Sequence, residues 1–204
     1  MNLLNLFNNQ PKTFNISSVK YKKPIDEQIV TRLIYYLQSY YNRLPKHSPH
    51  KIIVGIGGEI NSLVAAKLLK QALGENVEAI VFDIVNAAWT NSTVEFCKQL
   101  GVMTYVLKRG KQYQDEMSAY QLRSPSKIRH FYKHFINYHL LIQAEQMKAK
   151  VVDTIDKSDR LLEVRLEGFY GHFMPFYSLY KSEIFELAKF LGIPDQFIHP
   201  NSFK

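Results

Sequence analysis

The stretch that decides the fold reads KIIVGIGGEINSLVAAKLL and covers residues 51–69. Its apolar run at 52–54 is typical of a buried strand, and the glycines that follow predict a turn that opens into a helix near Asn61 and Ser62. A turn of this kind brings backbone N–H groups and a helix N-terminus towards a phosphate group. The same turn carries a carboxylate, Glu59, where an anion would be expected to lie. The stretch therefore predicts a phosphate site that has been either altered or abandoned.

The rest of the chain alternates predicted strands and predicted helices. After the strand at 51–55, short apolar runs predict strands at 77–82, 102–107 and 150–153. Helical spacing of apolar residues predicts helices at 24–41, 61–73, 91–100, 126–148 and 181–191. We expect a loop through Trp89, a polar stretch after residue 110 and a loop over 155–178. This order predicts a single α/β domain at 25–204, a doubly wound parallel sheet with crossover helices, after an N-terminal arm at 1–24.

Composition limits the classes of protein that need to be considered. The 204 residues are 46% hydrophobic and 13% aromatic, which is typical of a compact globular chain. The net charge of +8 favours anionic partners such as nucleotides, but no RNA- or DNA-binding motif accompanies it, so we expect no nucleic acid partner. No apolar run is long enough to span a bilayer and no secretory signal begins the sequence. The single cysteine, Cys97, is expected in a helix core. We therefore expect a cytoplasmic protein that is not bound to a membrane.

A ligand of such a sheet is expected at the carboxyl ends of the strands, where the strand order reverses. The residues that follow the predicted strands are 55–62, Asp83 and 154–159. The turn at 55–62 lacks the Gly-Lys-Ser/Thr ending of a Walker loop and the third glycine of the dinucleotide-binding fingerprint. Both of these common phosphate-binding families are therefore disfavoured.

A third family fits better, on four segments that occur in the right order. The turn Gly-Ile-Gly-Gly-Glu-Ile-Asn-Ser at 55–62 resembles the Ser-Gly-Gly-x-Asp-Ser pyrophosphate loop of N-type ATP pyrophosphatases, which have the adenine nucleotide alpha hydrolase type of fold. Lys-Ile-Arg at 127–129 is similar to the Ala-Arg-x-Arg segment of ammonia-dependent NAD synthases. Residues 152–159 resemble their Gly-Thr-x-Asn-Lys-Ser-Glu motif. The segment 174–194, from Met-Pro-Phe-Tyr to Leu-Gly-Ile-Pro, is similar to their C-terminal helix motif and is the most specific match.

The resemblance implies roles for residues at matching positions, with ATP and Mg²⁺ as the cofactors. Lys181 and Lys157 would act on the phosphates as catalytic residues, and Asp159 would replace a glutamate that binds Mg²⁺. The nucleotide and its phosphates would be contacted by Gly55, Gly57, Gly58, Asn61, Ser62, Asp83, Arg129, Thr154 and Ser182. The family reaction adenylates the carboxylate of deamido-NAD and then replaces AMP by ammonia. A homodimer and a small-molecule nucleotide substrate are expected by the same resemblance.

The sequence also departs from the family pattern at the phosphate loop. Relative to the family motif, Gly57 replaces a serine, Glu59 replaces a glycine and Asn61 replaces an aspartate. Two unit charges about 4 Å apart repel by about 4 kcal/mol at an effective dielectric constant of 20, so Glu59 would weaken binding of a triphosphate unless a cation lies between them. Alternatively, Glu59 simply points into solvent.

Three functional hypotheses follow, of which nucleic acid binding through a basic face is the least favoured. The first is an NAD synthase-like, ATP-dependent amide ligase whose activity is impaired by the altered loop. The second is a catalytically inactive relative that binds a nucleotide or acts as a scaffold. A zinc site at His130, His134 and His139 is a weaker alternative, because the spacing suits a metal but no acidic third ligand is near.

Overall fold

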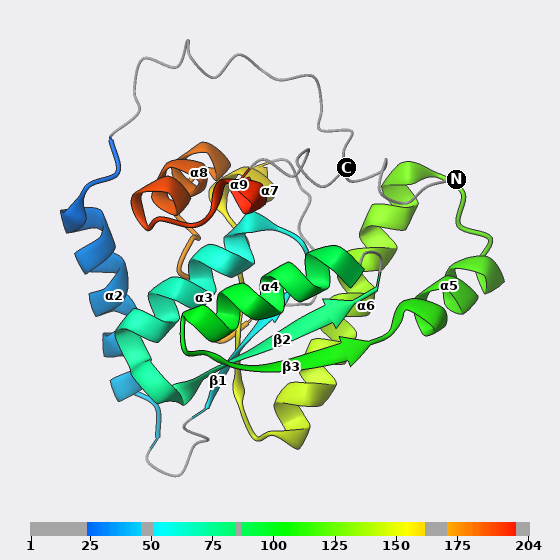
Figure 1. Ribbon diagram of the computed structural model, residues 1–204, viewed down its shortest axis with the longest axis horizontal. Coiled ribbons are helices and arrows are strands. Elements are labelled where there is room, and N and C mark those ends of the chain that lie inside the picture. The colour runs from blue at the N-terminus through cyan, green and yellow to red at the C-terminus, as the bar shows by residue number, and fades with distance from the viewer. Residues whose placement is uncertain (1–23, 46–50, 85–86, 162–170, 199–204) are drawn as a thin grey trace.

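The computed structural model describes residues 24–45, 51–84, 87–161 and 171–198 (Figure 1). Its centre is a parallel sheet in the order β3-β2-β1-β4, formed by β1 (Ile52–Ile56), β2 (Val77–Asp83), β3 (Met103–Lys108) and β4 (Lys150–Val152). Beside β4, Val152 forms an isolated parallel bridge with Phe173, and the Asp153 N–H donates to the carbonyl of Phe173 at 2.8 Å. The order reverses between β1 and β4, as a doubly wound sheet requires. The predicted arm at 1–24 lies almost wholly outside the described residues.

Helices cover both faces of the sheet (Figure 1). One face carries α2 (Glu27–Asn42), α3 (Ile60–Leu73), α4 (Ala87–Gln99), α8 (Lys181–Phe190) and the short α9 (Asp195–Ile198). The other face carries α6 (Pro125–Gln146) and the inner side of α5 (Gly110–Ala119). The short α7 (Lys157–Leu161) lies beside the N-terminal end of α8.

The strands supply alternate side chains to two separate cores. In β1, Ile52, Val54 and Ile56 pack with α3 and α8, whereas Ile53 packs with α6. Successive strand residues point to opposite faces, and here both faces are covered, so a continuous apolar run is what this position requires. The prediction that Cys97 lies in a helix core is confirmed. It is fully buried, and burial raises the pKa of its thiol to about 11.

Three local predictions were wrong. Trp89 lies within α4, which begins at Ala87, rather than in a loop. The polar stretch after residue 110 contains α5, a helix that is mostly polar but whose Tyr113 is fully buried. The expected loop at 155–178 contains α7, a helix too short to show a periodic pattern.

The edge strand β3 leaves apolar side chains in solvent. Met103 is 59% exposed, Tyr105 40% and Val106 39%, in contrast to the buried side chains of β1 and β2.

No helix in the described ranges has an apolar stretch long enough to cross a bilayer.

Candidate functional site

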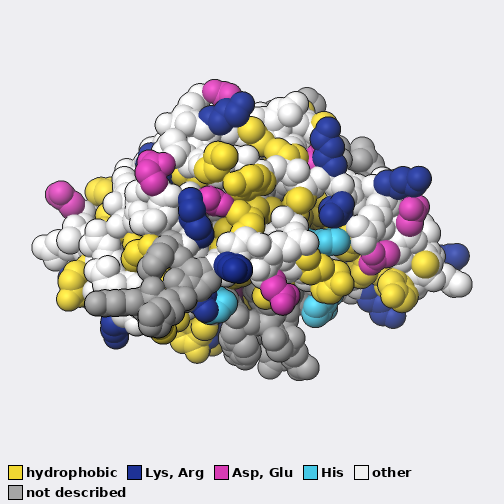
Figure 2. All heavy atoms as spheres, turned by 90° about the horizontal axis from the view of Figure 1, so that it is seen from below, with side chains coloured by type: hydrophobic (Ala, Val, Ile, Leu, Met, Phe, Trp, Pro, Cys, Tyr) yellow, Lys and Arg dark blue, Asp and Glu magenta, His cyan; other side chains and the backbone are white. Residues whose placement is uncertain are grey.

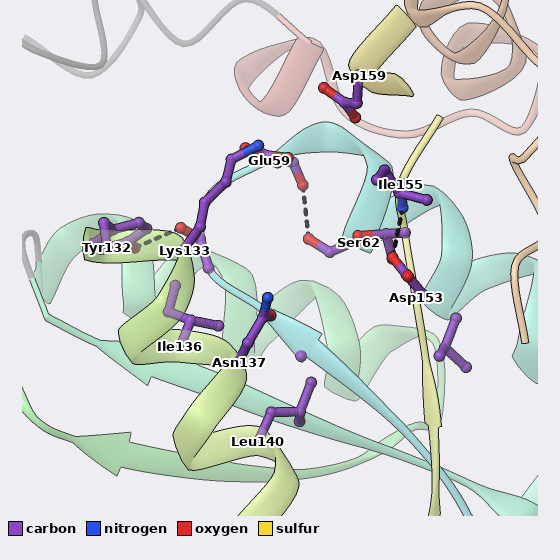
Figure 3. A pocket seen from close by; sticks show the side chains of 14 residues that line it. Glu59, Ser62, Tyr132, Lys133, Ile136, Asn137, Leu140, Asp153, Ile155 and Asp159 are labelled. Atoms are coloured by element: carbon purple, nitrogen blue, oxygen red, sulfur yellow. Dashed lines mark hydrogen bonds and ion pairs between the residues drawn. The ribbon is translucent and has the colours of Figure 1, made fainter. Parts of the chain in front are cut away.

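A pocket opens where the strand order reverses, between the ends of β1 and β4 (Figure 3). Its volume is about 120 Å³, which is enough for a phosphate-sized group. Three segments supply its lining: the turn after β1 with the start of α3, one face of α6, and the chain that follows β4. The lining residues are Gly55, Gly57, Glu59, Ser62, Tyr132, Lys133, Ile136, Asn137, Leu140, Val152, Asp153, Thr154, Ile155 and Asp159.

The glycine turn is held tightly against α6. The Tyr132 hydroxyl donates to the carbonyl of Gly57 at 2.6 Å. A Cβ atom at Gly57 would lie 2.4 Å from Cδ1 of Ile136, so the absence of a side chain at Gly57 makes this packing possible. Gly58 has φ +111°, a conformation that side chains rarely allow. The turn therefore needs glycine at Gly58, whereas a side chain at Gly57 would require the end of the Ile136 side chain to move.

Glu59 lines the pocket and has a cationic partner there. Its carboxylate lies 3.3 Å from Nζ of Lys133, and 51% of its side chain is exposed. Partial burial favours the protonated form, but the positive charges of Lys133 and Lys181 outweigh it and hold the pKa of Glu59 below its ordinary value. Glu59 is thus ionised at neutral pH. It neither points simply into solvent nor lies in the pocket without a compensating charge.

A second charged cluster joins α3, α7 and α8 behind the pocket. Nζ of Lys181 lies 2.7 Å from the carboxylate of Asp156 and 3.5 Å from that of Asp159. Lys181 also donates to Oδ1 of Asn61 at 3.1 Å, while the Asn61 amide donates to Asp156 at 3.0 Å and to the carbonyl of Thr154 at 2.8 Å. Residues far apart in the sequence are therefore tied together at the first turn of α3.

The protonation states in this cluster follow from burial and from Lys181. Burial opposes ionisation of Asp156, yet Lys181 and the Asn61 amide outweigh it and hold the pKa of Asp156 below its ordinary value. For Asp159 burial prevails, and with the neighbouring carboxylates of Glu59 and Asp156 it raises the pKa. Burial also opposes the charge of Lys181, but the three carboxylates around it raise its pKa. Lys181 therefore keeps its positive charge beside these carboxylates.

The predicted site residues fall into three groups. The pocket lining includes Gly55, Gly57, Ser62, Thr154 and Asp159. Asn61 and Lys181 stand directly behind it through the contacts just described, and Gly58 is in the turn. The remaining four residues are not in the pocket lining. Asp83 accepts a hydrogen bond from Thr90, and Lys157 lies over the ring of Tyr180. Arg129 is exposed on α6, and Ser182 is in the first turn of α8.

Sequence reasoning missed the contribution of α6 and the role of Asp156. Tyr132, Lys133 and Ile136 share one helical face, but a basic aromatic face of this kind is also typical of a solvated surface. Asp156 lies in the segment 152–159 that resembles the family motif, and its full burial could not be seen from one sequence. In the described part of the chain, no group of three or more His, Cys, Asp and Glu side chains could hold a metal ion. The three histidines on α6 therefore do not form the zinc site considered above.

Replacing Asp156 by Asn tests the buried cluster. We expect the free energy of unfolding at pH 7 to fall by about 3 kcal/mol, because the change leaves the Lys181 charge without its closest partner. A carboxylate whose pKa is lowered by folding stabilises the protein above its unfolded pKa of about 3.9, and this contribution disappears as the pH falls through the lower folded value. The deficit of D156N should therefore be full at pH 7 and shrink below about pH 4.

Urea unfolding at pH 7 and below about pH 4 measures the loss of stability in D156N. The control is Asp115→Asn on the exposed surface of α5, which removes the same charge without a buried partner. A loss below 1 kcal/mol in D156N at pH 7, or a loss that is independent of pH, would contradict the account.

The close approach of Gly57 and Ile136 predicts a coupled pair. Gly57→Ser should destabilise the protein by about 1 kcal/mol, because the new side chain forces the end of the Ile136 side chain to move. Ile136→Val removes that methyl group, so the double variant should be more stable than the sum of the two single changes predicts. A double-mutant cycle by chemical denaturation gives the coupling, and strictly additive losses would exclude the contact.

Comparison with known proteins gives a consistent result. The sequence model of the NAD synthase family matches residues 29–201. The chain is 27% identical over 178 residues to the NH(3)-dependent NAD(+) synthetase of Wolinella succinogenes, covering 83% of this chain and 66% of that protein. It is 31% identical over 157 residues to the enzyme of the same name from Campylobacter jejuni strain 81-176, covering 72% and 61%. The chain therefore spans less than two thirds of the length of these relatives.

Solved structures agree on the fold. The NH3-dependent NAD synthetase from Campylobacter jejuni, in complex with the nitrate ion, has a TM-score of 0.73 at 26% identity and covers 88% of this chain and 80% of its own. NMN synthetase from Francisella tularensis, at 20% identity and a TM-score of 0.71, shares the fold and covers 84% and 73%. The predicted single-domain α/β fold with a doubly wound sheet is confirmed, and with the family match at 29–201 the chain belongs to the NAD synthase family.

Proposed function

We propose that this protein is an ATP-dependent amide ligase that converts the carboxylate of deamido-NAD to an amide with ammonia, in the cytoplasm. The observation that carries the proposal is the pocket at the strand reversal. It is built from the glycine turn and the 152–159 segment, in a chain of the NAD synthase family. Two curated relatives are NH(3)-dependent NAD(+) synthetases, which supports the same chemistry for this chain.

The proposed reaction has two steps. A carboxylate oxygen of deamido-NAD attacks the α-phosphorus of ATP, and the bond to the departing pyrophosphate breaks. Ammonia then attacks the acyl carbon, AMP leaves with the oxygen, and the nitrogen loses a proton to solvent. Both steps produce phosphate anions, so a catalyst must stabilise negative charge at the phosphates.

The chain's residues suggest how this would be done. Backbone N–H groups near Gly57, Gly58 and Ser62, at the N-terminal end of α3, would hold the pyrophosphate end of ATP. Lys181 would contribute positive charge after partial release from Asp156 and Asp159. Thr154 lines the pocket beside the proposed nucleotide position.

The donor set fits Mg²⁺ of the kind that accompanies nucleotides. Such ions are commonly held by one or two carboxylates together with substrate phosphates rather than by a complete protein cage. Asp159 would be that carboxylate, and the ion would neutralise charge on the phosphates. The oxygen of Asp159 lies 3.5 Å from Lys181, so the two cations would share the carboxylate cluster.

The second candidate is an inactive nucleotide-binding or scaffold relative. The contact of Glu59 with Lys133 and the packing of Ile136 on Gly57 favour it, because both occupy space at the phosphate end of the pocket. A nucleic acid partner is not supported by the surface in Figure 2. On that face Lys and Arg side chains are dispersed among acidic and apolar ones and form no continuous basic patch among the described residues.

A coupled assay separates the two candidates. The full chain is incubated with ATP, Mg²⁺, deamido-NAD and ammonia, and both pyrophosphate and NAD⁺ are measured. We expect ammonia-dependent NAD⁺ formation, reduced about a hundredfold or more in Lys181→Met per folded molecule, with the folded fraction measured by urea unfolding, because a charge that stabilises the phosphates is lost. Lys189→Met is the control, since Lys189 is a half-exposed lysine on the same helix.

The negative outcomes are informative in different ways. Binding of ATP by calorimetry without NAD⁺ formation would favour the inactive nucleotide-binding relative. An absence of ATP binding at millimolar concentration would exclude both the ligase and the nucleotide-binding alternative.

We also propose that the chain forms a homodimer. The exposed apolar side chains Met103, Tyr105 and Val106 on the edge strand β3 support this, because an uncovered edge strand tends to pair or to be covered. Sedimentation velocity should show a dimer that Met103→Lys weakens. A monomer at all accessible concentrations would contradict the proposal.

A further inference from the structure

One face of α6 contacts the glycine turn through three different kinds of interaction. Tyr132 donates a hydrogen bond to the carbonyl of Gly57, Lys133 forms an ion pair with Glu59, and Ile136 fills the space where Gly57 has no side chain. Figure 3 shows these side chains directed from α6 towards the turn and the start of α3. The turn and α6 are therefore complementary at each of these three contacts.

Lys133 is placed where an anion in the pocket would be bound. It supplies the cationic side chain of the pocket lining among the described residues, and its side chain remains 27% exposed. It faces the N-terminal end of α3, where backbone N–H groups and the helix dipole already favour negative charge. An ammonium group beside a helix N-terminus in the lining of a small cavity suits a phosphate group.

The carboxylate that faces Lys133 comes from the turn itself. Glu59 is the residue that immediately precedes α3, and its side chain reaches across to Lys133. Because half of the Glu59 side chain is exposed, the pair is only partly shielded from water, and such pairs are weak enough to exchange for another anion.

We propose that Lys133 is a phosphate-binding residue of this pocket and that Glu59 occupies its place until a phosphate group displaces it. The inference rests on the pocket being the phosphate site of the proposed function and adds a residue to it. The ligand class is a phosphate or pyrophosphate group, and Glu59 sets how strongly that group must bind. Removing the Glu59 charge removes both a competitor for Lys133 and a repulsion of the ligand.

Calorimetric titration with inorganic pyrophosphate and Mg²⁺ tests the inference. Glu59→Gln keeps the shape of the side chain and removes its charge, and we expect pyrophosphate to bind about tenfold more tightly than to the unchanged protein. Glu75→Gln is the matched control, because it makes the same change in net charge at an exposed residue at the other end of the sheet, where Glu75 pairs with Lys70. That variant should leave the affinity unchanged.

A second substitution assigns the gain to Lys133. Adding Lys133→Met to E59Q should abolish the tenfold gain, whereas adding Lys98→Met, at an exposed residue of α4, should not. The same gain in E59Q and in E59Q/K133M would overturn the role of Lys133. No gain in E59Q, or equal gains in E59Q and E75Q, would overturn the role of Glu59.

The readout is independent of catalysis, so the two proposals can fail separately. A tenfold gain in E59Q without any NAD⁺ formation would keep the binding role of Lys133 and remove the ligase function. NAD⁺ formation without a gain in E59Q would do the reverse.

Discussion

Asp156 has no exposed surface, and an ionised carboxylate in that position must be compensated from every side. Lys181 from α8 and the amide of Asn61 from α3 provide this compensation at 2.7 and 3.0 Å, and the backbone N–H of Asp159 donates to the same carboxylate at 2.9 Å. The contact fixes α8 and α7 against the first turn of α3. That turn follows the glycines after β1, so the geometry of the pocket depends on a charge buried behind it.

The sheet and the helix after β1 could be predicted from the sequence because their signals are local. Buried strands require apolar runs, and 52–54, 79–82 and 151–152 provide them. The start of α4 and the short helices α5 and α7 could not be predicted from the sequence. Their residues are polar or few, and packing with distant residues decides their conformation. Tyr113 illustrates this: its burial against Phe131 and Phe135 of α6 is a tertiary contact that no local pattern shows.

Part of the lining of the candidate pocket could be predicted for the same reason. Gly57, Ser62, Thr154 and Asp159 follow strands, and the carboxyl ends of parallel strands meet at one edge, so the topology brings them together. Lys133 and Ile136 come from a helix that crosses this edge. Their place in the pocket depends on the rotation of α6 about its own axis, which a helical pattern with both polar and apolar residues on several faces does not determine.

The central claim is that the phosphate end of a nucleotide binds beside the turn at 57–62, between β1 and β4. A crystal structure of the full chain with ATP and Mg²⁺ tests it most directly. The account predicts density for the phosphates against Gly57, Gly58 and Ser62, with Glu59 turned away from Lys133. Phosphate density at another edge of the sheet, with the contact between Glu59 and Lys133 intact, would contradict it.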